Sequence, residues 1–379
     1  MYFMRVLRAI RRVFVPYTPL VEVEISRRAL LDNISAYQQE TRLPVAPVLK
    51  SNAYGHGLYE VASIVQVSHP PFLIVDSLYE AIFLRRNGIR VPILVIGYTA
   101  PENIVRVRAR NVVFVMTNLM QLRSVCKTLG RPIRVHLKVD TGMSRQGILP
   151  QELDQALQYI EASSHVQLEG ICSHFACADE ADFSVTSTQL GIWREVLARV
   201  HAYTKLRYWH VSATAGIHHI TSEDSNVLRL GIGMYGIDPA GNMNDRLRPA
   251  LSMYAPIVGI KHIPKGAIIG YGATVISDRP MCIATLPLGY FEGIDRRLSN
   301  KGFVIVRGKV CRIVGRVSMN ITLVDVTDVI DVEVGDRVLV FGGSHEGASS
   351  VMRLADTAQT IPYELLIHIP QHLRRIIVS

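Results

Sequence analysis

The sequence predicts an α/β protein in which a (β/α)₈ TIM-type barrel is followed by a mainly β C-terminal domain. Eight short, continuous apolar runs lie between residues 43 and 236 and alternate with segments of helical periodicity, as in a parallel sheet covered on both faces. Eight such units in about 200 residues favour a closed barrel over an open doubly wound sheet. No Gly-x-Gly-x-x-Gly follows the first run, which weakens a dinucleotide-binding alternative.

The barrel strands are predicted from runs rich in β-branched residues, with amphipathic stretches between most of them. Leu30, Leu31, Ile34 and Tyr37 repeat at helical spacing before the first run, and the segment 153–160 does so before the sixth. The predicted strands are Val45–Leu49, Phe72–Val75, Ile93–Ile96, Val112–Met116, Ile133–Val139, Val166–Cys172, Tyr208–Val211 and Val227–Ile232.

The composition changes near residue 245, where short strands separated by turn signals begin. Glycines at 266, 308 and 335 mark the turns, and helical periodicity returns only at Val351 to Ala358, behind a serine cap at Ser349 or Ser350. We therefore expect a basic N-terminal extension (1–15), a barrel (16–245) and a mainly β domain (246–379) that packs tightly against it.

Charge and composition exclude several classes of protein. The chain has 379 residues, 49% of them apolar and 19% charged, which is ordinary for a globular protein. No run approaches the length of a transmembrane helix. Four arginines before residue 13 supply part of the net charge of +9, so the rest of the chain carries 9 − 4 = +5. Because no basic and aromatic stripe accompanies that charge, nucleic acid is not expected as the main partner.

The N-terminal arm places Leu7, Ile10 and Phe14 at helical intervals beside its arginines. A membrane-surface helix is one interpretation, and a solvated extension is the one we favour. The arm is not a signal peptide, because arginines interrupt every apolar stretch.

The five cysteines are odd in number and lie mostly in apolar runs, so we expect reduced thiols in a cytoplasmic protein. Cys172 and Cys177 bracket His174, which suggests a metal site. If they continue one strand, however, the two thiols face opposite sides, so no metal is expected.

The segment Lys50–Gly57 carries most of the chemical information. It closes an apolar strand with a lysine and then turns through two glycines. Burial lowers the pKa of a lysine, and a partly neutral amine is what a Schiff base with an aldehyde cofactor needs. A lysine that only reaches out of a barrel rim is the structural alternative.

Function in a (β/α)₈ barrel lies at the carboxyl ends of the strands, and phosphate usually binds after strands seven and eight. A lysine and a phosphate cradle at one barrel mouth indicate pyridoxal phosphate or a Schiff-base aldolase. No carboxylate pair for glycoside chemistry and no His/Asp metal cluster lies there. The strand-end residues are Lys50, Lys138, Asp140, Arg145, His174, Ser212, Arg229, Gly231 and Ile232.

Several segments match one family in order along almost the whole chain, from about residue 18 to 375. The segments 50–57, 136–145, 169–174, 229–236, 270–274, 288–290 and 315–320 resemble the motifs of the alanine racemases. The resemblance implies a fold-type III pyridoxal 5′-phosphate enzyme that works as a head-to-tail homodimer. It also implies interconversion of L-alanine and D-alanine, with D-alanine used for peptidoglycan in the cell wall.

The resemblance assigns roles to individual residues. Lys50 would hold the cofactor and act as one base, and Tyr271 of the partner subunit would be the base on the opposite face. Two bases are needed because racemisation removes a proton from one face and returns one to the other. Implied cofactor-binding residues are Lys50, Tyr54, His174, Ser212, Arg229, Gly231 and Ile232; implied substrate-binding residues are Arg145, Met319 and Tyr290; Lys138 matches a lysine that is often carbamylated.

The chain departs from the family pattern at four positions. Asn320 and Glu292 each stand where aspartate is usual, Val211 replaces an asparagine, and Gln371 replaces a tyrosine near the phosphate. We hypothesise that Gln371 weakens the phosphate grip and admits a hydroxymethyl side chain. The first alternative to an alanine racemase is therefore a serine or broad small-amino-acid racemase. A non-catalytic carrier of pyridoxal phosphate is the less favoured alternative. A decarboxylase would need a cysteine or acid as the facing donor, and none matches.

Overall fold

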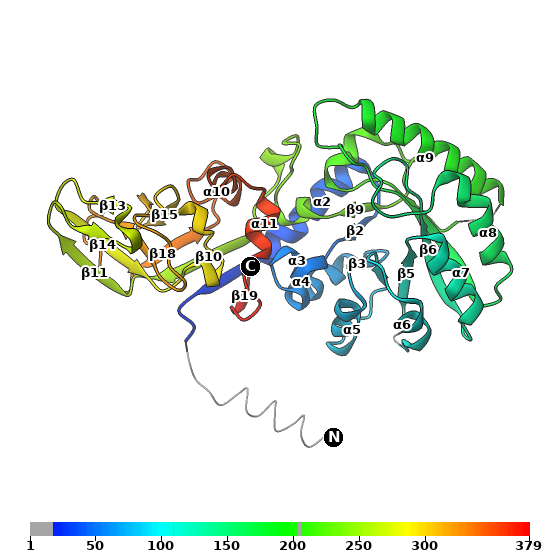
Figure 1. The fold of residues 1–379 in the computed structure, drawn as a ribbon, viewed down its shortest axis with the longest axis horizontal. Coiled ribbons are helices and arrows are strands. Elements are labelled where there is room, and N and C mark those ends of the chain that lie inside the picture. Colours follow the sequence, from blue (N-terminus) through cyan, green and yellow to red (C-terminus); the bar gives the residue numbers. More distant parts are fainter. Residues whose placement is uncertain (1–17, 109, 204–205) are drawn as a thin grey trace, which may run out of the picture.

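The computed structural model describes residues 18–108, 110–203 and 206–379. The N-terminal arm considered above lies outside these residues. The described chain forms a barrel and an elongated β-rich domain that lie end to end, with α11 (Pro362–Ile367) at their junction (Figure 1). The predicted fold class is confirmed.

The barrel consists of eight parallel strands. Strands β3 to β8 pair in sequence order, β2 pairs with β9, and a bridge from Val48 to Ile74 joins β2 to β3. Backbone hydrogen bonds from Asn226 to Trp209 and from Arg229 to Ser212 connect the last two strands. The strands are β2 (Val45–Pro47), β3 (Leu73–Val75), β4 (Ile93–Val95), β5 (Val112–Met116), β6 (Ile133–Lys138), β7 (Val166–Cys172), β8 (Tyr208–His210) and β9 (Leu228–Leu230).

Each predicted apolar run contains one of these strands, because strands buried on both faces are apolar throughout. The helices between them turn their apolar stripes inward; in α8, for example, Leu153, Leu157 and Ile160 are buried. The helices of the barrel half are α2 (Arg27–Thr41), α3 (Lys50–Tyr54), α4 (Leu58–Val65), α5 (Leu78–Arg86), α6 (Pro101–Arg106), α7 (Leu119–Thr128), α8 (Leu153–Glu161) and α9 (Ser184–Tyr203). None of the helices within the described ranges is long and apolar enough to cross a membrane.

The second domain is built on a six-stranded sheet and two smaller ones. Arg307 and Gly308, both with positive φ, form a two-residue hairpin turn between β15 and β16 at a predicted turn. Ser350 caps α10 (Val351–Ala358) by accepting a hydrogen bond from the Arg353 amide, which confirms one of the two predicted caps. The strands are β10 (Leu251–Pro256), β11 (Gly259–Ile263), β12 (Ile268–Ile269), β13 (Val275–Ile276), β14 (Met281–Leu286), β15 (Phe303–Val306), β16 (Lys309–Arg312), β17 (Thr322–Asp325), β18 (Arg337–Phe341) and β19 (Arg375–Val378).

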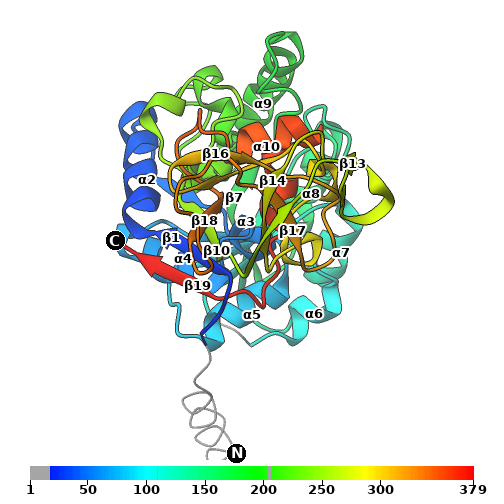
Figure 2. The same ribbon diagram turned by 90° about the vertical axis from the view of Figure 1, so that its left-hand side faces the viewer.

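The sheet of the second domain also contains a strand from the start of the described chain. β1 (Glu22–Ser26) lies between β10, to which it is antiparallel, and β19, to which it is parallel. Figure 2 shows β1 and β19 side by side on one edge of the domain. Val23 and Ile25 are fully buried, whereas the alternating glutamates are partly exposed, so the strand covers one face of the core.

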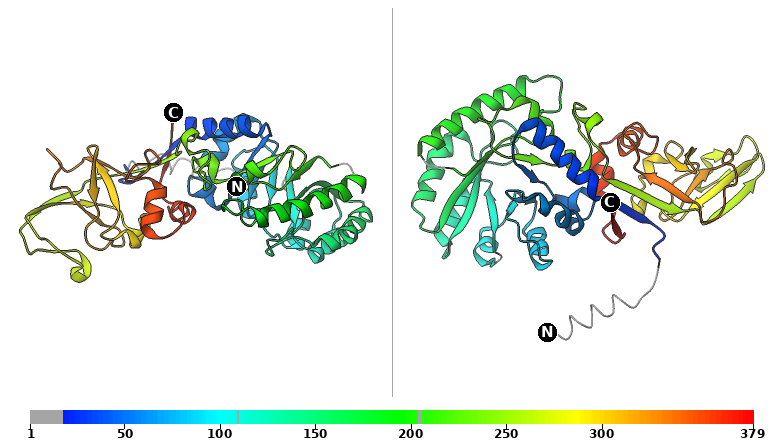
Figure 3. Two further views of the ribbon diagram at one scale, coloured as in Figure 1. Left: turned by 90° about the horizontal axis from the view of Figure 1, so that it is seen from above. Right: turned by 180° about the vertical axis from the view of Figure 1, so that it is seen from behind.

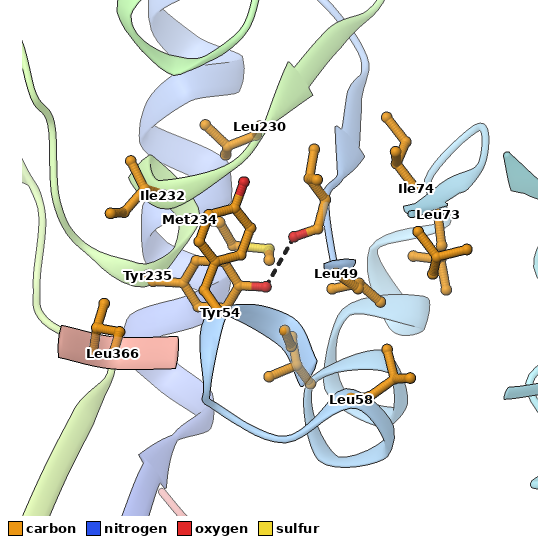
Figure 4. Packing of buried hydrophobic residues seen from close by; sticks show 14 of the residues in the cluster. Leu49, Tyr54, Leu58, Leu73, Ile74, Leu230, Ile232, Met234, Tyr235 and Leu366 are labelled. Atoms are coloured by element: carbon orange, nitrogen blue, oxygen red, sulfur yellow. Dashed lines mark hydrogen bonds between the residues drawn. The ribbon is translucent and has the colours of Figure 1, made fainter. Parts of the chain in front are cut away.

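The junction of the two parts is packed with aromatic and aliphatic side chains. Tyr54 and Tyr235 lie with their ring centroids 5.0 Å apart, and the Tyr235 hydroxyl donates to the Val48 carbonyl at 2.9 Å (Figure 4). Leu366 of α11 packs on the same cluster. The views from above and behind show α2 and α11 at this waist (Figure 3). The second domain therefore reaches the barrel mouth of its own chain through α11.

Candidate active site at the barrel mouth

A cavity of about 300 Å³ opens at the carboxyl ends of the barrel strands. Its lining brings together residues from β6, β7, β8 and β9, the loops that follow them, and α11. Eight residues predicted for the site line this cavity: Lys50, Tyr54, Lys138, Arg145, His174, Arg229, Gly231 and Ile232.

Lys50 is presented by an unusual backbone turn. Ser51, Asn52, Ala53 and Tyr54 follow it with φ between 52° and 56°, so α3 is a left-handed turn of four non-glycine residues. Each such residue costs roughly 1 to 2 kcal/mol relative to the right-handed form. Strain of this kind persists only where the surrounding structure enforces it, and it is common at functional sites.

The carboxylate of Glu80, in the first turn of α5, enforces this turn. One oxygen accepts the Ser51 amide at 2.8 Å, and the other accepts the amides of Asp76 and Ser77 at 2.9 and 3.1 Å. Ser77 and Glu80 form the capping box of α5, so one side chain begins that helix and fixes the backbone beside Lys50. On the other side, a Cβ at Gly55 would lie 1.9 Å from the Leu366 carbonyl oxygen, so only glycine allows α11 to approach.

Burial lowers the pKa of Lys50, and the nearby guanidinium groups of Arg145 and Arg229 lower it further, against the opposing effect of Asp76 and Glu80. At a given pH, a larger fraction of this amine is therefore neutral than of a free lysine amine. A nucleophile or a base requires the neutral form. Burial is also the main cause that lowers the pKa of Lys138, and the charges of the same two arginines add to it.

Arg229 lines the cavity and is 7% exposed. Its Nη1 donates to Nδ1 of His210 at 2.8 Å, and its Nη2 donates to Nδ1 of His174 at 3.0 Å. Carbonyl oxygens of Ser173, His210 and Val211 accept further hydrogen bonds from the same two nitrogens. Within the described ranges, Nε of Arg229 has no hydrogen-bond partner, so one N–H of a permanent cation remains available to a ligand.

The guanidinium decides the tautomer of both histidines. A guanidinium can only donate, so Nδ1 of His174 and Nδ1 of His210 must accept, and the ring proton of each lies on Nε2. Burial lowers the pKa of both rings well below its usual value, and the charge of Arg229 adds to this effect. His174 therefore lines the cavity as a neutral ring whose Nε2–H is a donor.

The hydrogen bonds continue from His210 toward the opposite end of the barrel. Nε2 of His210 lies 2.9 Å from Nδ1 of His136, and Nε2 of His136 lies 3.7 Å from a Glu169 oxygen. The other oxygen of Glu169 accepts from Arg134 at 2.7 Å. A second cavity of about 20 Å³ is lined by His136 and Glu169 among others and is large enough for one water molecule.

The loops after β8 and β9 form a cradle suited to a phosphate. The N–H groups of Gly231 and Ile232 donate to no other described residue. A Cβ at Gly231 would lie 2.9 Å from the Tyr54 hydroxyl and 3.8 Å from Thr214 Oγ1, so this glycine keeps the space beside two hydroxyl groups open. Free amides and hydroxyls around an open space are donors for an anion. The donor set therefore fits the phosphate of pyridoxal phosphate.

Arg145 is carried by a loop that one carboxylate organises. Oδ1 of Asp140 accepts the amides of Gly142, Met143 and Ser144 at 2.9, 2.9 and 3.1 Å. Burial acts against ionisation, but these N–H groups hold the pKa of Asp140 below its usual value. Asp140 was expected at the strand end, and its role here is to shape the loop so that Arg145 reaches the cavity.

Four residues assigned by resemblance do not line the cavity of their own chain. Ser212 is buried beneath it, and its hydroxyl donates to the Ala213 carbonyl at 2.9 Å. Tyr271, Tyr290 and Met319 lie in the second domain, with 72%, 43% and 56% of their surface exposed. Their roles stay predictions.

The structure adds residues that the sequence did not single out. Tyr363 of α11 lines the cavity with its ring centroid 5.9 Å from that of Tyr54, and burial raises its pKa to about 12. Thr214, His210 and Cys172 also line the cavity. Thr214 follows Ser212 by two residues in a loop already assigned to phosphate, so it could have been found, whereas Tyr363 lies far along the chain. Gln371 is exposed and does not line the cavity.

The chain matches two sequence families that together cover most of its length. Residues 25–239 match the family "Alanine racemase, N-terminal domain", and residues 250–377 match "Alanine racemase, C-terminal domain". "Alanine racemase 2" of Caldanaerobacter subterraneus subsp. tengcongensis is 34% identical over 365 residues, which are 94% of either chain.

Solved structures show the same fold. The alanine racemase of Streptomyces lavendulae superposes with a TM-score of 0.87 at 28% identity, covering 96% of this chain and 98% of that one. A histidine racemase from Leuconostoc mesenteroides subsp. sake superposes with the same TM-score and identity, covering 97% and 100%. The fold is thus shared by proteins whose substrates differ.

Proposed function

Since the chain belongs to the alanine racemase family, we propose that this amino-acid racemase interconverts L-alanine and D-alanine with pyridoxal 5′-phosphate. Enzymes of this family use that cofactor. The proposal includes the supply of D-alanine for peptidoglycan and action in the cytoplasm.

The observation that carries the proposal is the position of Lys50. Its amine lies in the same cavity as Arg229, His174 and the Gly231 cradle, and burial and two guanidinium groups lower its pKa. A lysine at a solvated barrel rim would have none of these features. This supports a lysine that carries the cofactor and exchanges a proton with the substrate α-carbon through Nζ.

When bound, pyridoxal phosphate supplies an aldehyde that captures an amine and a ring that withdraws electron density from the α-carbon. Gly231, Ile232, Tyr54 and Thr214 would hold its phosphate, and Ser212 would support the cradle from below. The free Nε–H of Arg229 is the donor left for the ring nitrogen. Because a guanidinium does not give up its proton, that nitrogen would stay unprotonated and the ring would withdraw less charge.

In this proposal the second base comes from another chain. Within its own chain, Tyr271 is exposed on the second domain and does not line the cavity. We propose a head-to-tail homodimer in which Tyr271 of the partner subunit takes or returns the proton on the face opposite Lys50. Met319 of the partner subunit and Arg145 would bind the substrate carboxylate, and Tyr290 of the partner subunit would narrow the entrance.

Lys138 has a separate role in this proposal. Its lowered pKa leaves a neutral fraction of the amine beside Arg145. A neutral amine can take up carbon dioxide as a carbamate, and the resulting anion would orient the guanidinium of Arg145 toward the substrate carboxylate.

Chiral analysis of products tests the proposal. The purified protein is incubated with pyridoxal phosphate and, separately, with L-alanine, L-serine or L-histidine. Fast D-alanine formation with little of the other D-products supports the proposal, and Lys50→Ala should abolish it. Comparable D-serine would indicate a broader racemase. No D-product from any substrate would contradict the proposal.

A further inference from the structure

A buried carboxylate bonds to both of two neighbouring loops of the second domain, 288–294 and 318–321. They carry Tyr290 and Met319, the residues proposed above to reach the site of the other subunit. Glu292 belongs to the first loop and is only 8% exposed. Its Oε2 accepts the Gly289 amide at 2.7 Å, and its Oε1 accepts Nδ2 of Asn320 at 2.7 Å.

The backbones of the two loops are in direct contact. The Tyr290 amide donates to the Ser318 carbonyl at 3.0 Å, and the Phe291 amide donates to the Met319 carbonyl at 2.9 Å. A Cβ at Gly289 would lie 2.1 Å from the Ser318 oxygen, so the approach requires glycine. A shift of either loop would therefore move Tyr290 and Met319 relative to one another.

The chemistry of the pair depends on one partner being an amide. A carboxylate only accepts hydrogen bonds, so each Glu292 oxygen needs a donor, and Asn320 supplies one of the two. An aspartate at position 320 would place two carboxylates at hydrogen-bond distance, and they would repel unless one held a proton. The two departures from the family pattern, at 292 and 320, thus form one complementary pair in this chain.

We propose that Glu292 and Asn320 are positioning residues that set the spacing of Tyr290 and Met319, and through them the fit of the substrate carboxylate. This inference rests on the proposed function. Neither residue needs to touch the substrate, because their effect passes through the backbone contacts between the two loops.

A double-mutant cycle tests the proposal with two measurements on the full-length holoenzyme. The variants are Asn320→Asp, Glu292→Gln and the double variant, with Gln155→Glu on the outer barrel helix α8 as a control for the added charge. Glutamine at 292 can accept from the Gly289 amide and donate to either residue at 320, so the single Glu292→Gln change should be mild and the double variant should restore the pair.

The first measurement is hydrogen exchange of the amides of Tyr290 and Phe291, which does not depend on activity. Asn320→Asp should speed their exchange about tenfold or more, a loss of roughly 1.4 kcal/mol of local stability, and the double variant should return it to the wild-type rate. The control should leave it unchanged. Equal exchange in Asn320→Asp and wild type, or no recovery in the double variant, would overturn the proposal.

The second measurement is the kinetics with L-alanine. Asn320→Asp should raise KM more than it lowers kcat, and the double variant should recover KM. An unchanged KM in Asn320→Asp would contradict the link to the substrate. If the variants show the expected amide exchange but the wild-type protein forms no D-alanine, the proposed function is contradicted. The pairing of the two loops through Glu292 and Asn320 would still be established.

Discussion

Nε2 of His210 lies 2.9 Å from Nδ1 of His136, and the proton between them belongs to His210. This direction follows because Nδ1 of His210 already accepts from Arg229, which can only donate. His136 must then carry its proton on Nε2, toward Glu169. One guanidinium at the barrel mouth thus sets the direction of the hydrogen bond between the two histidines, and it leaves the Nε2–H of His136 facing the Glu169 carboxylate 3.7 Å away.

Arg229→Gln should raise the pKa of His174. The charge of Arg229 is the largest contribution after burial to the lowered value, and glutamine removes that charge. Titration of the imidazole ring protons by NMR would measure the change, and D-alanine formation should fall tenfold or more. Arg353→Gln, on the exposed face of α10, serves as the control. An unaltered His174 titration in Arg229→Gln would contradict this electrostatic account.

Mixing two inactive variants should restore activity if the site is shared between subunits. Lys50→Ala and Tyr271→Phe each lack one proposed base. In a mixed head-to-tail dimer, one site lacks both bases and the other has both, so random exchange should give about one quarter of the wild-type sites. Recovery is measured after dissociating and reassociating an equimolar mixture. If no activity returns while mixed dimers are shown to form, both bases come from one chain and the sharing is wrong.

Acid should destabilise the fold through His56. Burial lowers its pKa to about 4, against a usual value of 6.5. The unfolded chain therefore binds a proton below pH 6.5 that the folded chain does not bind until about pH 4. The contribution is fully present above pH 6.5 and is lost as pH falls toward 4, at about 1.4 kcal/mol per unit. Denaturant unfolding at several pH values should show that His56→Asn lacks this part of the slope.

The left-handed turn after Lys50 should respond to substitution at Ser51, whose side chain is exposed and whose φ is 56°. Glycine adopts this conformation freely, whereas a β-branched residue is strongly disfavoured there. Ser51→Val should therefore be less stable than Ser51→Gly by about 1 to 2 kcal/mol. Denaturant midpoints would measure the difference, and equal midpoints would show that the turn relaxes without cost.

The sequence allowed prediction of the barrel because its local pattern and its long-range structure agree. Buried parallel strands are apolar throughout, and all eight runs contain a strand. The partner of β1 could not be predicted in this way. Its alternation of Val23 and Ile25 with glutamates indicates a strand, but nothing local indicates that β10 and β19 flank it.

Site residues at the ends of barrel strands could be predicted from the sequence, whereas those that depend on long-range contacts could not. Lys50, Arg229 and His174 were found because strand ends converge in a barrel. Tyr363 was missed because α11 reaches the cavity from the second domain. The left-handed turn was also missed, because serine, alanine and tyrosine do not favour positive φ and only the contacts of Glu80 and Leu366 enforce it.

The place of β1 between β10 and β19 has a consequence for synthesis. As the polypeptide leaves the ribosome, β1 emerges long before either of its neighbours, β10 and β19, so its Val23 face stays uncovered through much of translation. Barrel strands β3 to β8, by contrast, pair with sequence neighbours and can assemble as they appear. Completion of this sheet has to wait for β19, whose pairing with β1 joins the two ends of the described chain.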